Sequence, residues 1–313
     1  MRIAILDDYQ GVAESLADWS TLEADIVFFP DHVSDQGRLL SRLAGFDVIV
    51  AMRERTPFPR AVLEGLPDLR LLVTTGAANA SIDVKAAQEL GVVVSGTASL
   101  PHPTAELTMA LILALARGLV AETSSVRDGG WQLGLGRDLL GSLLGVIGLG
   151  RLGSQVARLG QAFGMEVLGW SQNLTRDGAS EVGVSLVSKE ELLRRSDFVT
   201  IHLRLSDRTR GLIGQGELSS MRPTAYLVNT SRGPIVDEAA LLTAVRTGVI
   251  SGAALDVYDQ EPLPQDHPFR YEPGILATPH VGYVTRESYQ VFYEGAIEAI
   301  EAWRDGSPIR LIS

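Results

Sequence analysis

The sequence predicts an α/β protein with two parallel-sheet domains, and three observations support this. Short β-prone runs alternate with helical segments in the first hundred residues and again from Leu143 onward. Such alternation is typical of a parallel sheet covered by helices on both faces. The two series are separated by a proline-containing break at residues 99–104. The chain has 313 residues, 45% of them hydrophobic, which is enough for two buried cores.

The first series contains five expected strands and at least three expected helices. The strands are residues 3–6, 25–29, 47–51, 70–74 and 92–94, and the helices are 34–43, 61–66 and 84–90. After the break, Thr104 is the expected N-cap of a long helix that ends near Arg117. The apolar run 107–116 is shorter than the roughly 20 residues that a membrane span needs, so it predicts a buried helix.

The second series follows a glycine-rich loop at residues 128–141 and opens with a strand at Leu143. Further strands are expected at 166–170, 197–203, 225–229, 252–257 and 275–277, and helices at 152–163, 189–194, 215–221 and from the N-cap Asp237 to Thr247. The tail, 287–304, carries one apolar stripe at helical period. A helix of that kind could return to cover the first domain.

Composition excludes several classes of function. The net charge of −11 argues against a nucleic-acid or anionic-membrane partner, since either requires a basic face. The absence of cysteine excludes disulfides, thiolate catalysis and cysteine metal sites. No cluster has metal-ligand spacing. The apolar run after Met1 is too short for a signal peptide, so we expect a cytoplasmic protein.

The most informative stretch is Gly148-Leu149-Gly150-Arg151-Leu152-Gly153. It stands between an apolar strand and a helix, which is the context of a dinucleotide-binding fingerprint. The glycines allow a tight turn, let backbone N–H groups approach a pyrophosphate and let the helix pack closely on the strand. Glycine triplets also occur in ordinary turns, so the residues that follow must decide whether this stretch binds a nucleotide.

Three chemically useful side chains come just after three successive strands: Arg232, Glu261 and His280. Arg232 offers a planar fork for a carboxylate, and His280 can exchange a proton with a hydroxyl group while Glu261 orients its ring. Taken singly, they could instead be a helix-capping or ion-paired arginine, a solvated loop acid and a turn histidine. Together, behind a nucleotide fingerprint, they favour hydride transfer to or from a 2-hydroxy acid.

The glycine fingerprint and the segments Asn229-Thr230-Ser231-Arg232-Gly233, Asp259-Gln260-Glu261-Pro262 and Thr278-Pro279-His280 resemble the D-isomer-specific 2-hydroxyacid dehydrogenases. The resemblance covers nearly the whole chain. It implies a Rossmann NAD(P)-binding domain, residues 99–283, inserted in a flavodoxin-like substrate domain formed by 1–98 and 284–313.

The resemblance also implies the roles of individual residues. Arg232 would bind the substrate carboxylate, and Glu261 and His280 would form the acid/base pair. Asp256 would lie near the nicotinamide, with Thr230 and Gly282 also on the cofactor. The turn at Gly76 and Ala77 would present backbone N–H groups to the substrate carboxylate. The family further implies a homodimer built around the 104–117 helix.

Two positions depart from the family pattern. Ser171 stands where NAD-preferring members carry an acid that binds the ribose hydroxyls, so the cofactor is NAD or NADP. Arg176 is close enough in sequence to be a candidate 2′-phosphate clamp. Arg204 replaces a proline of many relatives, and we interpret it as a solvated residue at the rim.

Several alternatives stay open from sequence alone. Arg53 and Arg55 could meet an anionic substrate or pair with Glu54, and the particular 2-hydroxy or 2-keto acid is not determined. His102 fits a hinge or helix start. Trp131 could pack or reach a neighbouring active site across a dimer. The alternative function is a non-catalytic nicotinamide sensor, as in corepressor-like relatives. Formate dehydrogenases pair the histidine with glutamine, and Glu261 argues against that activity.

Overall fold

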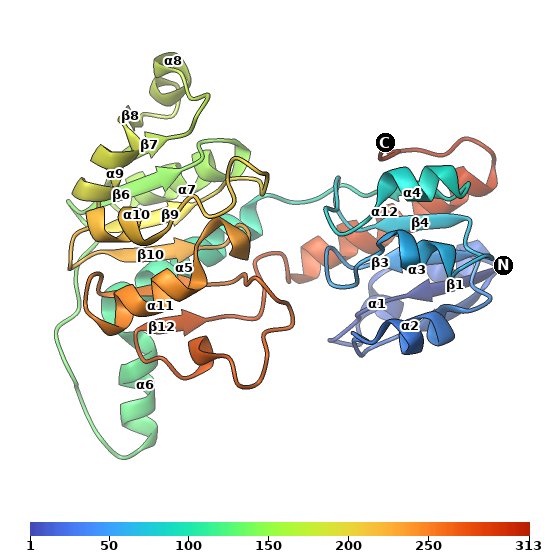
Figure 1. Cartoon of the computed structure of the whole chain (residues 1–313), viewed down its shortest axis with the longest axis horizontal. Coiled ribbons are helices and arrows are strands. Elements are labelled where there is room, and N and C mark those ends of the chain that lie inside the picture. Colours follow the sequence, from blue (N-terminus) through green and yellow to red (C-terminus); the bar gives the residue numbers. More distant parts are fainter. The chain divides into compact units, whose positions relative to one another are not determined.

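The computed structural model describes residues 1–313 and divides the chain into two compact units (Figure 1). The first unit comprises Met1–Leu100 and Val284–Ser313, and the second comprises Pro101–Tyr283. Both are α/β units built on parallel sheets, as the alternating pattern predicts.

The first unit has a five-stranded sheet in the order β2-β1-β3-β4-β5. Its strands are β1 (Arg2–Ile5), β2 (Asp25–Phe28), β3 (Val48–Ala51), β4 (Leu71–Thr74) and β5 (Val93–Gly96). Its connecting helices are α1 (Ala13–Leu16), η1 (Trp19–Leu22), α2 (Gln36–Leu43), α3 (Arg60–Glu64) and α4 (Val84–Glu89). The strands β3 and β4 are buried on both faces, which explains their continuous apolar runs.

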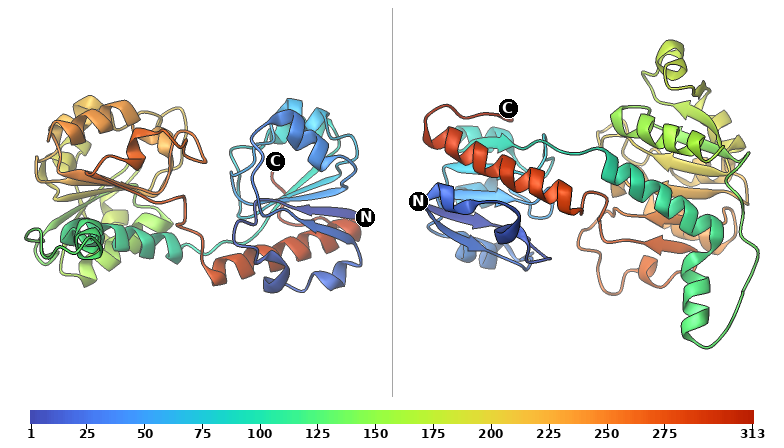
Figure 2. Two further views of the ribbon diagram at one scale, coloured as in Figure 1. Left: turned by 90° about the horizontal axis from the view of Figure 1, so that it is seen from below. Right: turned by 180° about the vertical axis from the view of Figure 1, so that it is seen from behind.

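The tail forms the 19-residue helix α12 (Arg286–Arg304), which packs on β4 and β5 of the first unit. Figure 2 shows it lying across one face of this sheet. Its buried face includes Tyr289, Phe292 and Tyr293, and Thr285 caps its first turn by accepting a hydrogen bond from the Ser288 N–H. The predicted apolar stripe is therefore the face that joins the C-terminal segment to the N-terminal hundred residues.

The second unit has a seven-stranded sheet in the order β12-β11-β10-β9-β6-β7-β8. Its strands are β6 (Leu143–Ile147), β7 (Glu166–Trp170), β8 (Ser185–Leu186), β9 (Phe198–Ile201), β10 (Tyr226–Asn229), β11 (Gly252–Leu255) and β12 (Ile275–Ala277). The order reverses between β6 and β9. In doubly wound sheets the ligand lies at this switch point, beyond the carboxyl ends of the strands.

Nine helical segments connect or cover these strands. They are α5 (His102–Arg117), α6 (Leu119–Arg127), α7 (Arg151–Ala162), α8 (Arg176–Ser180), α9 (Lys189–Arg195), α10 (Gln215–Ser220), α11 (Glu238–Arg246), and the short turns η2 (Gly233–Ile235) and η3 (Pro268–Arg270), with Gly118 joining α5 to α6. Asp237 caps α11 by accepting from the Ala240 N–H at 2.9 Å, as predicted.

The start of α5 differs from the prediction. The helix begins at His102 after the N-cap Pro101, so the expected N-cap role of Thr104 is wrong. The Thr104 hydroxyl donates instead to the Gly282 carbonyl at 2.9 Å. The second residue of the helix is Pro103, which has no backbone N–H, so one donor fewer needs a cap at this helix start.

The helix α5 packs within its own unit on α7, β10 and β11. No single helix of the chain is long and apolar enough to cross a membrane; α5 and α6 meet that criterion only as a pair, bent by 63°. The second member of the pair, α6, lies where the sequence suggested no helix. It has no buried residue and projects from the rest of the unit (Figure 1).

Candidate active site

The glycine turn joins β6 to α7 at the switch point of the second sheet. Gly148 adopts a φ of 96°, which favours glycine, and its N–H donates to the Trp170 carbonyl at 2.8 Å. A Cβ at Gly153 would lie 1.9 Å from the Gly148 carbonyl oxygen, so only glycine fits there. A Cβ at Gly150 would meet nothing of the chain within 4 Å.

These features fit the pyrophosphate of a dinucleotide. The N-cap of α7 is Gly150, and no side chain caps the helix, so the N–H groups of its first turn have no side-chain acceptor. The positive end of a 12-residue helix then favours a phosphate. Leu149, Arg151 and Leu152 lie in this turn and the start of the helix, where the sequence places them.

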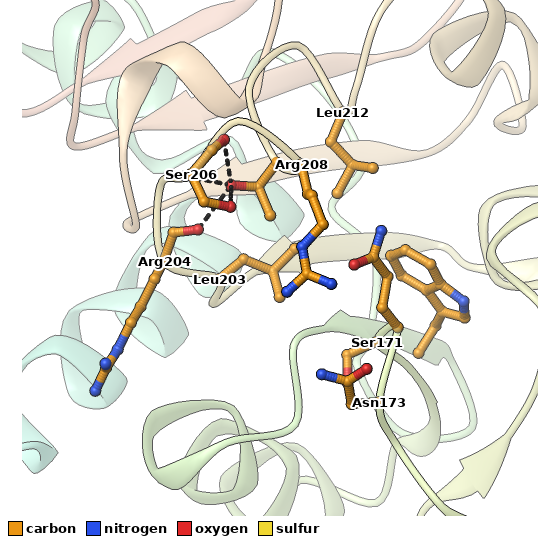
Figure 3. A pocket seen from close by; sticks show the side chains of 10 residues that line it. Ser171, Asn173, Leu203, Arg204, Ser206, Arg208 and Leu212 are labelled. Carbon is orange, nitrogen blue, oxygen red and sulfur yellow. Dashed lines mark hydrogen bonds between the residues drawn. The ribbon is translucent and has the colours of Figure 1, made fainter.

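A pocket of about 320 Å³ opens beside this turn, at the carboxyl ends of β7 and β9. It is lined by Trp170, Ser171, Gln172, Asn173, Leu203, Arg204, Ser206, Arg208, Thr209 and Leu212 (Figure 3). Arg176, the candidate clamp suggested by sequence, does not line the pocket. It opens α8 and is exposed. Arg208, which no sequence pattern indicated, lines the pocket from the loop that follows β9.

Glu261 and His280 form a hydrogen-bonded pair. The His280 Nδ1 lies 2.6 Å from Glu261 Oε2, and Glu261 Oε1 accepts from the Tyr258 N–H at 3.0 Å. The two side chains are 17% and 31% exposed, so both remain accessible from solvent. The edge of the His280 ring meets Tyr283, with centroids 5.3 Å apart. Both oxygens of Glu261 are engaged, which fixes the imidazole by its Nδ1 and leaves Nε2 without a partner in the chain.

The segment that carries His280 is held by Asp256. Its carboxylate accepts from the Val281 N–H and the Gly282 N–H, both at 2.8 Å, and from the Thr278 hydroxyl at 2.6 Å. Burial raises the pKa of Asp256, while these hydrogen bonds and the nearby His280 oppose that rise. His280 itself has a φ of 52°, a backbone conformation that non-glycine residues seldom adopt. The tether therefore holds a strained loop in place.

Arg232 follows β10 on a loop that packs against the Glu261 loop. Asn229 shapes it, accepting from the Ser231 N–H at 3.0 Å and donating to the Arg232 carbonyl at 2.9 Å. A Cβ at Gly233 would lie 2.0 Å from the Tyr258 carbonyl carbon. The loop that carries Arg232 thus contacts the backbone of the residue that holds Glu261.

The structure gives Thr230 and Gly282 contacts within the protein. The Thr230 hydroxyl lies 2.9 Å from the Thr108 hydroxyl in a buried position, which joins α5 to the end of β10. Gly282 uses its N–H on Asp256 and its carbonyl on Thr104. Both residues lie in the loops that the sequence indicated, with these polar groups already paired.

The candidate substrate residues of the first unit lie after β3 and β4. Arg53 donates to the Thr75 carbonyl at 3.0 Å and lies over Gly76. The Gly76 N–H donates to the Thr97 hydroxyl at 2.7 Å, so the predicted role of this N–H is not available, and of the predicted pair only the exposed Ala77 keeps an N–H without a partner in the chain. Arg55 donates to the Asp7 carbonyl at 2.6 Å and to the Tyr289 hydroxyl at 3.1 Å.

A further titratable residue, His202, follows β9 directly. Its Nε2 lies 2.9 Å from the Thr200 hydroxyl, and its Nδ1 is buried without a hydrogen-bond partner. Burial lowers the pKa of His202 to about 3, so the ring is neutral at physiological pH. Sequence reasoning did not single it out, because burial of a ring cannot be derived from a strand-end position.

Comparison with known proteins places this geometry in a family. Residues 109–282 match the family described as D-isomer specific 2-hydroxyacid dehydrogenase, NAD binding domain. A glyoxylate reductase of Aeropyrum pernix is 42% identical over 255 residues, 78% of this chain and 76% of that protein. A glycerate dehydrogenase of Methylorubrum extorquens is 34% identical over 88% of each chain.

Solved structures agree. The crystal structure of a phosphoglycerate oxidoreductase from Vibrio cholerae O395 superposes with a TM-score of 0.94 at 38% identity, covering 98% of this chain and 99% of that one. The glycine turn, the strand-end side chains and these similarities lead to one conclusion. The chain belongs to the D-isomer-specific 2-hydroxyacid dehydrogenases, oxidoreductases that use a nicotinamide cofactor.

Proposed function

We propose that this enzyme interconverts a small 2-keto acid and its D-2-hydroxy acid, with Arg232 on the carboxylate and Glu261 and His280 as the acid/base pair. The observation that supports this most is the 2.6 Å contact between His280 Nδ1 and Glu261 Oε2 at the carboxyl end of the sheet that bears the glycine turn. A histidine fixed through one ring nitrogen offers the other for proton transfer.

The proposed chemistry divides among these residues. A bound nicotinamide supplies the hydride that reaches the carbonyl carbon. Arg232 binds the carboxylate and polarises the adjacent carbonyl oxygen, which the guanidinium fork suits. His280 delivers a proton from Nε2 to that oxygen, and Glu261 stabilises the charged ring. In the reverse direction His280 accepts the hydroxyl proton.

The substrate class follows from the relatives and from the first unit. The similar proteins are named for glyoxylate and glycerate, so we propose a two- or three-carbon acid such as glyoxylate or hydroxypyruvate. In this proposal the exposed Ala77 and the half-buried Arg53 contribute to its binding. The non-catalytic alternative has no support among these relatives, which are named as enzymes.

We also propose that the protein is a homodimer in the cytoplasm. A chain without cysteine, which forms no disulfides, is compatible with that reducing compartment. The surface that supports dimerisation is α6 with the segment 131–140, rather than the largely buried α5. The segment folds back on α6: Ser125 donates to the Trp131 carbonyl, and Glu122 accepts from the Leu133 N–H. Large apolar side chains of α6 and the segment are exposed, namely Leu119, Val120, Val126, Trp131, Leu133, Leu135 and Leu140.

A panel of 2-keto acids tests the proposed activity. The full chain is assayed with glyoxylate, hydroxypyruvate, pyruvate and 3-phosphohydroxypyruvate, each with NADH and with NADPH, and the chirality of the product is determined. We expect the smaller acids to be reduced, with D-products where the product is chiral. Cofactor binding without turnover of any of these acids contradicts the proposal and favours the sensor alternative.

A further inference from the structure

We propose that Arg208 makes this enzyme selective for NADPH, by binding the adenosine 2′-phosphate in the pocket beside Ser171. The inference deepens the proposed function, because it names which nicotinamide dinucleotide the site takes. The sequence leaves that choice open at Ser171, and the structure places a cationic side chain, Arg208, in the lining of the same pocket.

The location of the pocket fits the adenosine ribose. The Gly148 N–H donates to the Trp170 carbonyl, and Ser171 is the next residue, so the pocket begins directly beside the glycine turn. Leu203, on the opposite wall, also packs close to Gly148. A dinucleotide with its pyrophosphate on the turn places its adenosine ribose at the end of the second strand of the fold, which here is β7.

The lining of the pocket suits an added phosphate. It contains two arginines and no aspartate or glutamate. Ser171, Asn173 and Gln172 add hydroxyl and amide donors. A carboxylate at position 171 would accept the ribose hydroxyls and repel a phosphate, whereas a serine hydroxyl can donate to one.

The orientation of the side chains distinguishes Arg208 from Arg204. In Figure 3 the Arg208 guanidinium points toward Ser171 and Asn173, and Arg204 extends away from them. Arg208 is exposed and makes no hydrogen bond or ion pair with another residue of the chain. Its charge is therefore available to a ligand, and an arginine fork matches phosphate oxygens well.

The loop that carries Arg208 is ordered by its own hydrogen bonds. The Thr209 hydroxyl donates to the Arg204 carbonyl at 2.7 Å and accepts from the Ser206 N–H at 2.8 Å. The Arg210 N–H donates to the Ser206 carbonyl at 2.9 Å. These bonds close a tight turn around residues 204–210, which presents the side chain at position 208 to the pocket without help from a ligand.

A pair of nucleotide fragments isolates the 2′-phosphate. Calorimetric titration of the full chain with adenosine 2′,5′-bisphosphate and with 5′-AMP compares ligands that differ only in that group. We expect the bisphosphate to bind at least about 10-fold more tightly. Arg208→Gln should remove most of this ratio while 5′-AMP still binds, and Ser171→Asp should reverse it. Binding of 5′-AMP shows in the same experiment that each variant is folded.

Two further variants make the test specific. Arg210→Gln removes the same charge from the same loop outside the pocket lining, and should leave the ratio unchanged. Arg176→Gln tests the clamp suggested by sequence and should also leave it unchanged. Equal binding of the two fragments, no binding of either, or loss of the ratio in Arg176→Gln rather than in Arg208→Gln overturns the inference. Fragment binding does not require turnover. A lack of activity on every keto acid would therefore contradict the proposed function without deciding the role of Arg208.

Discussion

At the scale of single residues, the proposed activity depends on one imidazole and the carboxylate that holds it. One carboxylate oxygen of Glu261 accepts from the Tyr258 N–H, and the other contacts His280 Nδ1. The orientation of the imidazole ring is therefore set by the loop that follows β11. An ionised carboxylate on Nδ1 places a hydrogen there, which leaves Nε2 as the atom that exchanges a proton with substrate.

Glu261→Gln tests this arrangement. The amide keeps the size of the side chain and can still accept from Tyr258, but it cannot stabilise a charged imidazole. We expect kcat for keto-acid reduction to fall about 10²-fold with cofactor affinity unchanged. Glu272→Gln, at an ion pair with Arg246, is the matched control and should leave kcat unaltered. A Glu261→Gln enzyme with full kcat would contradict the role assigned to the pair.

His202 provides a residue-scale prediction for stability. Its pKa is lowered from 6.5 to about 3, so the unfolded chain binds a proton below pH 6.5 that the folded protein does not accept until about pH 3. The folded state therefore loses stability as the pH falls through this window. Between pH 7 and pH 4 the loss is on the order of 3 kcal/mol for this group alone.

Urea unfolding of the wild type and of His202→Asn at several pH values measures that loss. The wild type should lose more stability than the variant on acidification from pH 7 to pH 4, because the variant has no imidazole to protonate when it unfolds. Parallel curves for the two proteins over this range would show that His202 is not buried in its neutral form.

At the scale of elements, three loops after β10, β11 and β12 assemble the candidate site of the second unit. Each loop is fixed by contacts with a neighbouring loop. Gly233, after β10, packs on the backbone of Tyr258, after β11. The Tyr258 N–H donates to Glu261 and the Tyr258 hydroxyl donates to the Thr278 carbonyl, while the Asp256 carboxylate accepts from the N–H groups of Val281 and Gly282 after β12. Parallel strands end at one edge of the sheet, which explains why residues far apart in sequence meet there.

Gly233→Ala tests this contact between loops. The added Cβ would lie 2.0 Å from the Tyr258 carbonyl carbon, so one of the two loops must move. We expect a loss of about 1–3 kcal/mol in the free energy of unfolding, and a higher KM for the keto acid because Arg232 is displaced. Gly216→Ala is the control, since its Cβ would meet nothing within 4 Å and the residue lies in α10. An unchanged KM in Gly233→Ala would contradict the contact.

Most of the elements could be predicted from hydrophobic pattern and turn residues. The buried strands β3, β4 and β6 appear as apolar runs, and Asp237 marks the start of α11. The failures have physical reasons. Thr104 has the right residue type for a cap, but its hydroxyl is taken by Gly282 of a distant segment. The helix α6 has no buried face, so it shows no amphipathic period.

At the scale of the whole molecule, the order of strands and polar residues in the sequence predicts part of the proposed site and not the rest. Arg232, Glu261 and His280 were recognisable because each follows a strand of one sheet. Arg208 was not, because its approach to Ser171 depends on the course of the loop after β9. Similarly, no pattern indicates that the Gly76 N–H is taken by Thr97, a residue from the next strand's end.

The proposed dimer is tested on the surface formed by α6 and residues 131–140. Leu135 is fully exposed and Trp131 is 75% exposed, which is costly for apolar side chains unless a second copy covers them. We expect the wild type to be a dimer by light scattering, and Leu135→Asp with Trp131→Ala to be monomeric. Leu90→Asp, a similar change at an exposed leucine of the first unit, should leave the dimer intact. A wild-type monomer contradicts this part of the proposal.

The most direct test of the central claim is a single-turnover measurement on His280→Ala. The variant is loaded with reduced nicotinamide cofactor, mixed with glyoxylate or hydroxypyruvate, and followed at the absorbance of the reduced ring. We predict that cofactor affinity is unchanged and that the rate of oxidation falls about 10²- to 10⁴-fold. A variant that binds cofactor and oxidises it at the wild-type rate would contradict the assignment of His280 as the proton donor.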